Sequence, residues 1–279
     1  MAAASSSSPG ELRSMLKISN LVKSYGSDKP VLRNLDLTVP ERSVVSIIGA
    51  SGAGKSTLLR CINRLVEPTS GDIELNGVNL TRLQGRELRT ARRRIGMIFQ
   101  SFNLVDRLTV MENVLSGRLG YVSFFRAAFR RFPQEDIDRA FHFMERVGIA
   151  HYANKRADEL SGGERQRVGV VRALMQGPEI LLADEPTASL DPKTSEQIMA
   201  LLRSLSEELA LPVLINIHNV AEAKEYTDRI VGMRFGRIIF DGAPSTLDQA
   251  AMDQIYAGVP AEDRLADGAG VQVLKVASS

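Results

Sequence analysis

The feature that most constrains this 279-residue chain is the segment at 49–56, which reads GASGAGKS. A short apolar run at 44–48 comes directly before it, and a stretch with helical character follows it. The pattern G-x-x-x-x-G-K-[ST] between a strand and a helix predicts a phosphate-binding loop. The alternative is a turn of small residues that holds no ligand.

The residue types of this loop suit phosphate chemistry. Glycines let the backbone curl so that successive N–H groups point at phosphate oxygens, and the helix after the loop adds partial positive charge. Lys55 is expected to reach the β- and γ-phosphates, and the hydroxyl of Ser56 is expected to bind Mg²⁺. The predicted ATP-binding residues here are Gly49, Ala50, Ser51, Gly52, Ala53, Gly54, Lys55, Ser56 and Thr57.

Apolar runs with no polar alternation recur at 44–48, 180–183 and 213–217, with helical patterns between them. Strands that are buried on both faces belong in a parallel sheet covered by helices, so the chain is predicted to be α/β. The stretch at about 100–160 has helical patterns and no strand pattern. In it, Ile137, Phe141, Met144 and Val147 recur at helical spacing and predict one buried helix face.

This organisation predicts an inserted helical subdomain at about 100–160 within a main domain at 16–245. A disordered tail is expected at 1–15 and a short C-terminal tail at 246–279. The sequence at 1–15 lacks the apolar segment of a secretory signal. No apolar run reaches the roughly 18 residues that cross a bilayer, so another chain must supply any membrane spans.

Composition excludes some classes of protein. Lys and Arg number 35 and Asp and Glu number 33, and this near balance argues against a nucleic-acid partner. The 44% of apolar residues argues against a mostly disordered chain. The single cysteine, Cys61, excludes an internal disulfide and fits a reducing compartment.

Two further motifs carry chemistry. The apolar run ILLA ends in Asp184 and Glu185; Asp184 is placed to help hold Mg²⁺, and Glu185 to polarise an attacking water. The segment at 160–166 reads LSGGERQ and opens a helix. Ser161 followed by Glu164 is a capping box, and the helix N-terminus is also a ready anion site.

Together, GASGAGKS, LSGGERQ and LLADEP resemble the nucleotide-binding subunits of ATP-binding cassette (ABC) transporters, from about residue 16 to 242. The resemblance implies a P-loop ATPase cassette with a mainly parallel core sheet, an N-terminal antiparallel β subdomain and an inserted helical subdomain. It also implies a homodimer that sandwiches two ATP molecules. In such a dimer the signature residues Ser161, Gly162, Gly163 and Glu164 act in trans, on ATP held by the P-loop of the other copy.

Further roles are implied by the resemblance, one position at a time. Tyr25 matches the aromatic residue that stacks on adenine, although a strand-end tyrosine without a ligand is an equal reading. Gln100 matches the glutamine that contacts Mg²⁺ and the attacking water, which makes Ser56, Gln100 and Asp184 the predicted magnesium residues. Ser189, Leu190 and Asp191 match the loop at the dimer interface.

His218 matches the histidine that senses the γ-phosphate, which gives Glu185, His218 and Gln100 as the predicted catalytic residues. Asn219 departs from the pattern, because an acid or a glutamine is more usual after that histidine.

Three segments, at 113–121, 124–132 and 224–242, resemble the ATPases of phosphonate importers. This implies uptake of phosphonates through two integral-membrane permease subunits, with an external solute-binding protein and the ATPase at the cytoplasmic face of the inner membrane. An importer of phosphate or polar amino acids is the alternative cargo. The other classes are a soluble ABC ATPase without a transport role and a P-loop kinase that turns over as a monomer.

Overall fold

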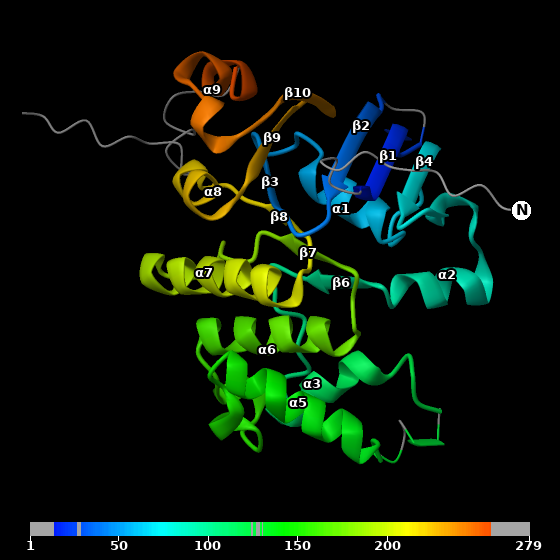
Figure 1. The fold of residues 1–279 in the computed structure, drawn as a ribbon, viewed down its shortest axis with the longest axis vertical. Helices are drawn as coiled ribbons and strands as arrows, with labels where there is room; N and C mark the ends of the chain where they lie inside the picture. The colour runs from blue at the N-terminus through cyan, green and yellow to red at the C-terminus, as the bar shows by residue number, and fades with distance from the viewer. Residues whose placement is uncertain (1–13, 27–28, 124, 127–128, 130, 258–279) are drawn as a thin grey trace, which may run out of the picture.

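Two β-sheets frame the molecule in the computed structural model, which describes residues 14–26, 29–123, 125–126, 129 and 131–257 (Figure 1). The first sheet is antiparallel, with strand order β2-β1-β4-β5. Its strands are β1 (Ser14–Lys23), β2 (Leu32–Pro40), β4 (Ser70–Leu75) and β5 (Val78–Asn79). In β2, Leu35, Leu37 and Val39 are buried and alternate with exposed residues, as a sheet with one covered face requires.

The second sheet is mainly parallel, with strand order β10-β9-β3-β8-β7-β6. Only β10 runs antiparallel to its neighbour, β9. Its strands are β3 (Val44–Ile48), β6 (Ile95–Ile98), β7 (Ile180–Asp184), β8 (Val213–Asn216), β9 (Arg229–Arg234) and β10 (Arg237–Gly242). The three apolar runs of the sequence are thus the neighbouring strands β3, β8 and β7, and the predicted α/β class is confirmed.

Both faces of this sheet are covered. Leu182 and Leu214 point into a core that also holds α1 (Lys55–Ile62) and the first sheet. Their neighbours Leu181 and Ile215 point into the opposite core, which the helices of the second half of the chain complete. This explains why these strands are apolar without alternation. It also leaves their carboxyl ends as the place where polar side chains gather.

The helical part of the chain lies at one end of the molecule, away from β1, β2 and β4 (Figure 1). Among the described residues, no strand lies between Ile98 and Ile180. The helices here are α3 (Val110–Leu115), α5 (Gln134–Arg146) and α6 (Gly162–Met175), with short 3-10 turns at Ser116–Arg118, Ala150–Tyr152 and Ala157–Glu159. Because α6 packs on both α3 and α5, the helical part continues past residue 160.

The buried face of α5 only partly coincides with the residues that the sequence pattern predicted to be buried. Phe143 is buried, with 7% of its surface exposed, whereas Phe141 is 40% exposed. Ala140, Phe143 and Met144 make the contact with the rest of the core. The prediction for Phe141 was therefore wrong, while Met144 and Val147 are buried as predicted.

The remaining helices close the fold around the second sheet. They are α2 (Gly85–Arg92), α7 (Pro192–Leu209), α8 (Val220–Tyr226) and α9 (Gln249–Ile255), with 3-10 turns at Leu80–Arg82 and Pro244–Thr246. Ile255 and Tyr256 are buried, so α9 packs on the domain although it lies in the segment expected to be a tail. Likewise β1 begins at Ser14, two residues before the expected start.

The rest of the two expected tails, 1–13 and 258–279, lies outside the described residues. No helix in the described part of the chain is both long enough and apolar enough to cross a membrane.

Candidate functional site

The predicted phosphate-binding loop joins β3 to α1. Gly54 precedes the first turn of α1 with a φ of 101°, a left-handed conformation that favours glycine. Gly49 is required for space, since a Cβ there would lie 2.2 Å from the carbonyl oxygen of Met233. The Nζ of Lys55 donates to the carbonyls of Gly49, at 2.6 Å, and Ala50, at 3.2 Å. The loop thus holds the ammonium group of Lys55 against its own backbone.

The loop borders a cavity of about 310 Å³ at the carboxyl end of the parallel strands. This is where ligands bind in open α/β sheets. Glu185 comes directly after β7, His218 lies two residues after β8, and both reach the same cavity. The lining residues are Val31, Ser51, Gly52, Ala53, Gly54, Lys55, Ser56, Thr57, Glu185 and His218. Residues predicted from three separate motifs therefore meet in one place.

A polar cluster around the buried carboxylate of Asp184 lies beside the loop. The hydroxyl of Ser56 donates to Oδ1 of Asp184 at 2.8 Å, and the side-chain amide of Asn216 donates to the same Oδ1 at 2.8 Å. The Asn216 amide also lies 3.2 Å from the Ser56 hydroxyl. Nη2 of Arg60 lies 3.7 Å from the other carboxylate oxygen of Asp184. Side chains from β8 and α1 thus converge on the carboxylate at the end of β7.

Glu185 and His218 form a pair at the wall of the cavity. His218 Nε2 lies 2.6 Å from Oε1 of Glu185. This hydrogen bond is the main reason that the pKa of Glu185 is lowered; burial opposes it, and the charges of His218 and Lys55 add to it. Glu185 has a φ of 51°, so its backbone is in the left-handed region. The fold keeps a carboxylate, in its ionised form, at a strained position.

The predicted signature residues lie at the N-terminus of α6. The Ser161 hydroxyl accepts from the N–H of Glu164 at 3.4 Å, and a carboxylate oxygen of Glu164 accepts from the N–H of Ser161 at 2.7 Å. The predicted capping box is therefore confirmed. A hydrogen bond from the Tyr152 hydroxyl is the main cause that holds the pKa of Glu164 below its usual range.

The signature residues line a second cavity, of about 250 Å³, which shares no residue with the first. Ser189, Leu190 and Asp191 line it too. Asp191 caps α7, with Oδ1 accepting from the N–H of Thr194 at 3.1 Å. One short loop therefore has Glu185 in the first cavity at its start and Asp191 in the second cavity at its end. The predicted interface loop and the predicted signature meet within one chain.

Comparison with known proteins identifies this arrangement. The family model described as ABC transporter matches residues 32–188, which is more than half of the chain. The chain belongs to the ABC transporter family. Its cassette fold, as predicted, combines an antiparallel sheet with a mostly parallel one. Like other ABC ATPases, it binds ATP.

The curated relatives cover nearly the whole chain. "Phosphonates import ATP-binding protein PhnC 1" of Ruegeria sp. (strain TM1040) is 74% identical over 91% of this chain and 99% of the relative. "Phosphonates import ATP-binding protein PhnC 2" of Synechococcus sp. (strain JA-2-3B'a(2-13)) is 58% identical over 89% of this chain and 95% of the relative.

Among solved structures, the ATP-binding cassette MJ0796 is similar, as a dimer in a post-hydrolysis state bound to ADP and Pi. It is 36% identical, with a TM-score of 0.72, over 82% of this chain and 99% of that one.

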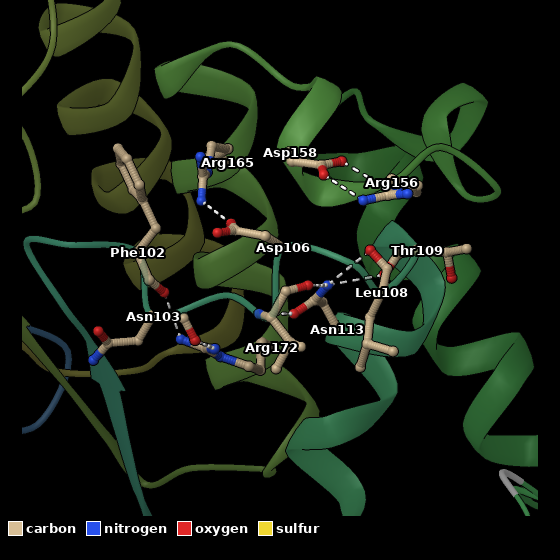
Figure 2. Close-up of polar contacts among 11 residues, drawn as sticks. Phe102, Asn103, Asp106, Leu108, Thr109, Asn113, Arg156, Asp158, Arg165 and Arg172 are labelled. Carbon is tan, nitrogen blue, oxygen red and sulfur yellow. Dashed lines mark hydrogen bonds and ion pairs between the residues drawn. The ribbon is translucent and has the colours of Figure 1, made fainter.

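Gln100 of this ABC ATPase lies two residues after β6 and is exposed. It is not among the residues that line the first cavity. The loop after it is tied to α6, because Arg172 donates to the carbonyls of Phe102, at 2.8 Å, and Asn103 (Figure 2). Phe102 and Asn103 both have positive φ, of 58° and 51°. Two consecutive left-handed residues turn the chain sharply, and Arg172 holds the turn.

The same loop has two further anchors (Figure 2). Arg165 of α6 forms an ion pair with Asp106, and its guanidinium lies 5.5 Å from the ring centre of Phe102. Asn113 of α3 accepts from the N–H of Val105 at 2.8 Å and donates to three carbonyls, including that of Val105 at 3.1 Å. The segment after Gln100 is thus fixed to the helix that begins at the signature.

Tyr25 lies apart from the loop. It comes shortly after β1, is 50% exposed and has the Lys23 ammonium 4.7 Å from its ring centre. It does not line the first cavity. Its adenine-stacking role therefore stays a prediction.

Asn219, which departs from the family pattern, has a local role. Its side chain accepts from the N–H of Ala221 at 2.9 Å and caps α8.

Asn216 is a polar residue of this site that the sequence analysis did not single out. The available signal was a polar amide at the end of an otherwise apolar strand.

Proposed function

We propose that this chain is the ATP-hydrolysing subunit of an importer of phosphonates. The observation that carries the proposal is the 74% identity, over nearly the full length of both chains, to a relative named as a phosphonates import ATP-binding protein. The cavity at the carboxyl ends of β3, β7 and β8 supports it, because it brings together the groups that ATP hydrolysis needs.

In this role, the P-loop binds the triphosphate. The N–H groups at the start of α1 and the partial charge of the helix attract phosphate oxygens. Lys55 is buried at the loop, with 5% of its surface exposed, and exchanges its two carbonyl partners for phosphate oxygens. Electrostatic stabilisation of this kind is commonly the largest single contribution to catalysis.

The donor set beside the loop fits Mg²⁺. Ser56 and Asp184 offer hard oxygen ligands, and Asp184 is only 5% exposed. Mg²⁺ is commonly bound through one or two carboxylates together with substrate phosphates and water. When bound, Mg²⁺ neutralises charge on the phosphates. Ser56, Asp184 and Gln100 would hold it.

Glu185 orients and polarises the water that attacks the γ-phosphate. The lowered pKa of Glu185 keeps the carboxylate ionised at neutral pH, so it can accept a hydrogen bond from that water. His218 holds this carboxylate in place and lies in the same cavity. Gln100, which follows β6 and does not line this cavity, is assigned to the same water by the family pattern alone.

The active unit is a homodimer with ATP between two copies. Each chain has a P-loop cavity and a separate signature cavity, so a second copy can place its Ser161 against the nucleotide held by the first. The dimeric state of the similar cassette supports this arrangement. The remaining subunits are two membrane permeases and an external solute-binding protein, with the ATPase at the cytoplasmic face of the inner membrane.

A mixing experiment tests the sandwich. Lys55→Ala disables one half-site, and Ser161→Glu disables the other, since a carboxylate repels the triphosphate. Each variant alone is expected to be inactive. A 1:1 mixture is expected to recover about one quarter of the wild-type active sites, because each mixed dimer has one site made of two intact halves. No recovery in dimers shown to have mixed would contradict action in trans.

The cargo is tested in vesicles that contain the permease pair. ATPase activity is measured with the binding protein presented with a phosphonate, inorganic phosphate or a polar amino acid. Stimulation by the phosphonate alone is the expected result. Stimulation by phosphate or an amino acid instead would assign the chain to the alternative importer.

A further inference from the structure

Asn216 is a buried amide in an apolar strand. It is the last residue of β8, its side chain is fully buried, and Val213, Leu214 and Ile215 before it are buried apolar residues. Burying an amide costs free energy unless the group is hydrogen-bonded. The contacts of Asn216 therefore show what the fold uses it for.

The amide nitrogen of Asn216 joins two groups of the site. It donates to Oδ1 of Asp184 at 2.8 Å and to the hydroxyl oxygen of Ser56 at 3.2 Å. The orientation of the amide is set by chemistry, since a carboxylate accepts and must face the NH₂ group. Because Ser56 also donates to the same Oδ1, the three side chains form a closed triangle.

The triangle fixes where the Ser56 hydroxyl can bind a cation. A hydroxyl has one proton and two lone pairs. Here the proton goes to Asp184 and one lone pair accepts from Asn216. A single lone pair remains, and its direction is set by the other two bonds. Without Asn216, the hydroxyl could keep its bond to Asp184 and offer either lone pair.

Asn216 also supports Glu185. Its backbone carbonyl accepts from the backbone N–H of Glu185 at 3.1 Å. The oxygen of the Asn216 side-chain amide, Oδ1, is buried and has no hydrogen-bond partner in the described part of the structure. Asn216 thus contacts three of the four residues that the proposed mechanism assigns to the metal and the water, namely Ser56, Asp184 and Glu185.

We propose that Asn216 is a positioning residue for Mg²⁺, which orients the Ser56 hydroxyl and the Asp184 carboxylate before the ion arrives. This inference rests on the proposed function, because it takes Ser56 and Asp184 as ligands. Partners of this kind behind metal ligands typically change metal affinity by about 10- to 100-fold when they are removed.

The test measures binding of a non-hydrolysable ATP analogue by calorimetry, without Mg²⁺ and over a series of MgCl₂ concentrations. Asn216→Leu keeps the size and burial of the side chain and removes the amide. Affinity in EDTA is expected to stay within about twofold of wild type, because Asn216 does not line the P-loop cavity. The MgCl₂ concentration for half-maximal enhancement is expected to rise by about 10- to 100-fold.

Asn216→Ser is the second variant, for use if the leucine variant does not fold. The smaller serine side chain cannot clash with its neighbours. Its hydroxyl is too short to reach both Oδ1 of Asp184 and Oγ of Ser56. Ser46→Ala is the matched control, since Ser46 is a fully buried polar residue of β3 that bonds to Thr227, outside the triangle. The control is expected to keep the wild-type MgCl₂ dependence.

Three outcomes are distinguishable. A raised MgCl₂ requirement with unchanged affinity in EDTA supports the inference. An unchanged requirement, or an equal loss of affinity with and without Mg²⁺, overturns it. A wild-type protein whose binding of the analogue is indifferent to Mg²⁺ would overturn the proposed magnesium site itself.

Discussion

The P-loop cavity and the signature cavity of one chain are built in opposite ways. The first lies where parallel strands end, and polar groups beside it are bonded to one another, as in the triangle of Ser56 with the buried residues Asp184 and Asn216. The second lies at an exposed helix end, where Ser161 and Glu164 cap their own helix. The first is fixed by long-range packing and the second by a local motif.

This difference teaches how a site can be divided between two copies. The capping box satisfies the N–H groups of Ser161 and Glu164 within the chain, so this exposed helix N-terminus is stabilised without a partner. The P-loop cavity, in turn, brings Lys55, Glu185 and His218 together within one chain. In the proposed dimer, association then only has to bring a preformed helix N-terminus to a preformed cavity.

Glu185→Gln is the sharpest way to separate binding from chemistry in the first cavity. Glutamine keeps an acceptor for His218 but cannot take a proton, so kcat is expected to fall by about 10²- to 10⁴-fold. ATP affinity is expected to stay near wild type. Steady-state ATPase assays and calorimetry check the two quantities; an unchanged kcat would remove Glu185 from its assigned role.

Arg172→Gln tests the link between the two regions. It removes the charged donor that holds the carbonyls of Phe102 and Asn103, and the free energy of unfolding is expected to fall by about 2 kcal/mol. Arg203→Gln is the control, because Arg203 makes exposed ion pairs and is expected to lose less than about 1 kcal/mol. Equal urea midpoints for the two variants would contradict the anchoring role.

Ser161→Ala weakens the second region alone. Loss of the cap is expected to lower the free energy of unfolding by about 1 kcal/mol. The affinity of the monomer for ATP is expected to be unchanged, because Ser161 does not line the P-loop cavity. Thermal unfolding and nucleotide titration check this; a drop in monomer affinity would mean that the two cavities are not independent.

The smallest expected effect concerns the pH dependence of the helix cap. The pKa of Glu164 is lowered in the folded state, first by the Tyr152 hydroxyl. Its contribution to stability is therefore present above the pKa of an unfolded glutamate and is lost as pH falls through the lowered folded value. Tyr152→Phe is expected to raise the pKa of Glu164, measured by NMR titration of its carboxyl carbon. An unmoved titration would assign the shift to the cap alone.

Much of the first cavity could be predicted from the sequence, because motif and strand end coincide there. The runs at 44–48, 180–183 and 213–217 are apolar on both faces, which identifies central strands, and parallel strands place the residues after their carboxyl ends at one edge of the sheet. Glu185 was predicted in this way, and His218 was predicted from the resemblance to ABC ATPases. The caps at Ser161 and Asp191 were predictable because they are local.

The features that could not be predicted depend on tertiary contacts. Asn216 stands in an otherwise apolar run, and no local pattern marks it as a site residue. Its partners Ser56 and Asp184 lie 160 and 32 positions away in the chain. Phe141 has the right spacing but misses the contact face of α5, whose position is set by packing on α6. The anchors of the loop after Gln100 include arginines of α6, and no local pattern pairs them with this loop.

The left-handed backbone of Glu185 sets function against stability. Such a conformation costs a residue with a side chain about 1–2 kcal/mol, and glycine or asparagine adopts it far more readily. A change to either residue is therefore expected to relieve strain in the folded protein while it removes the carboxylate that hydrolysis is proposed to need.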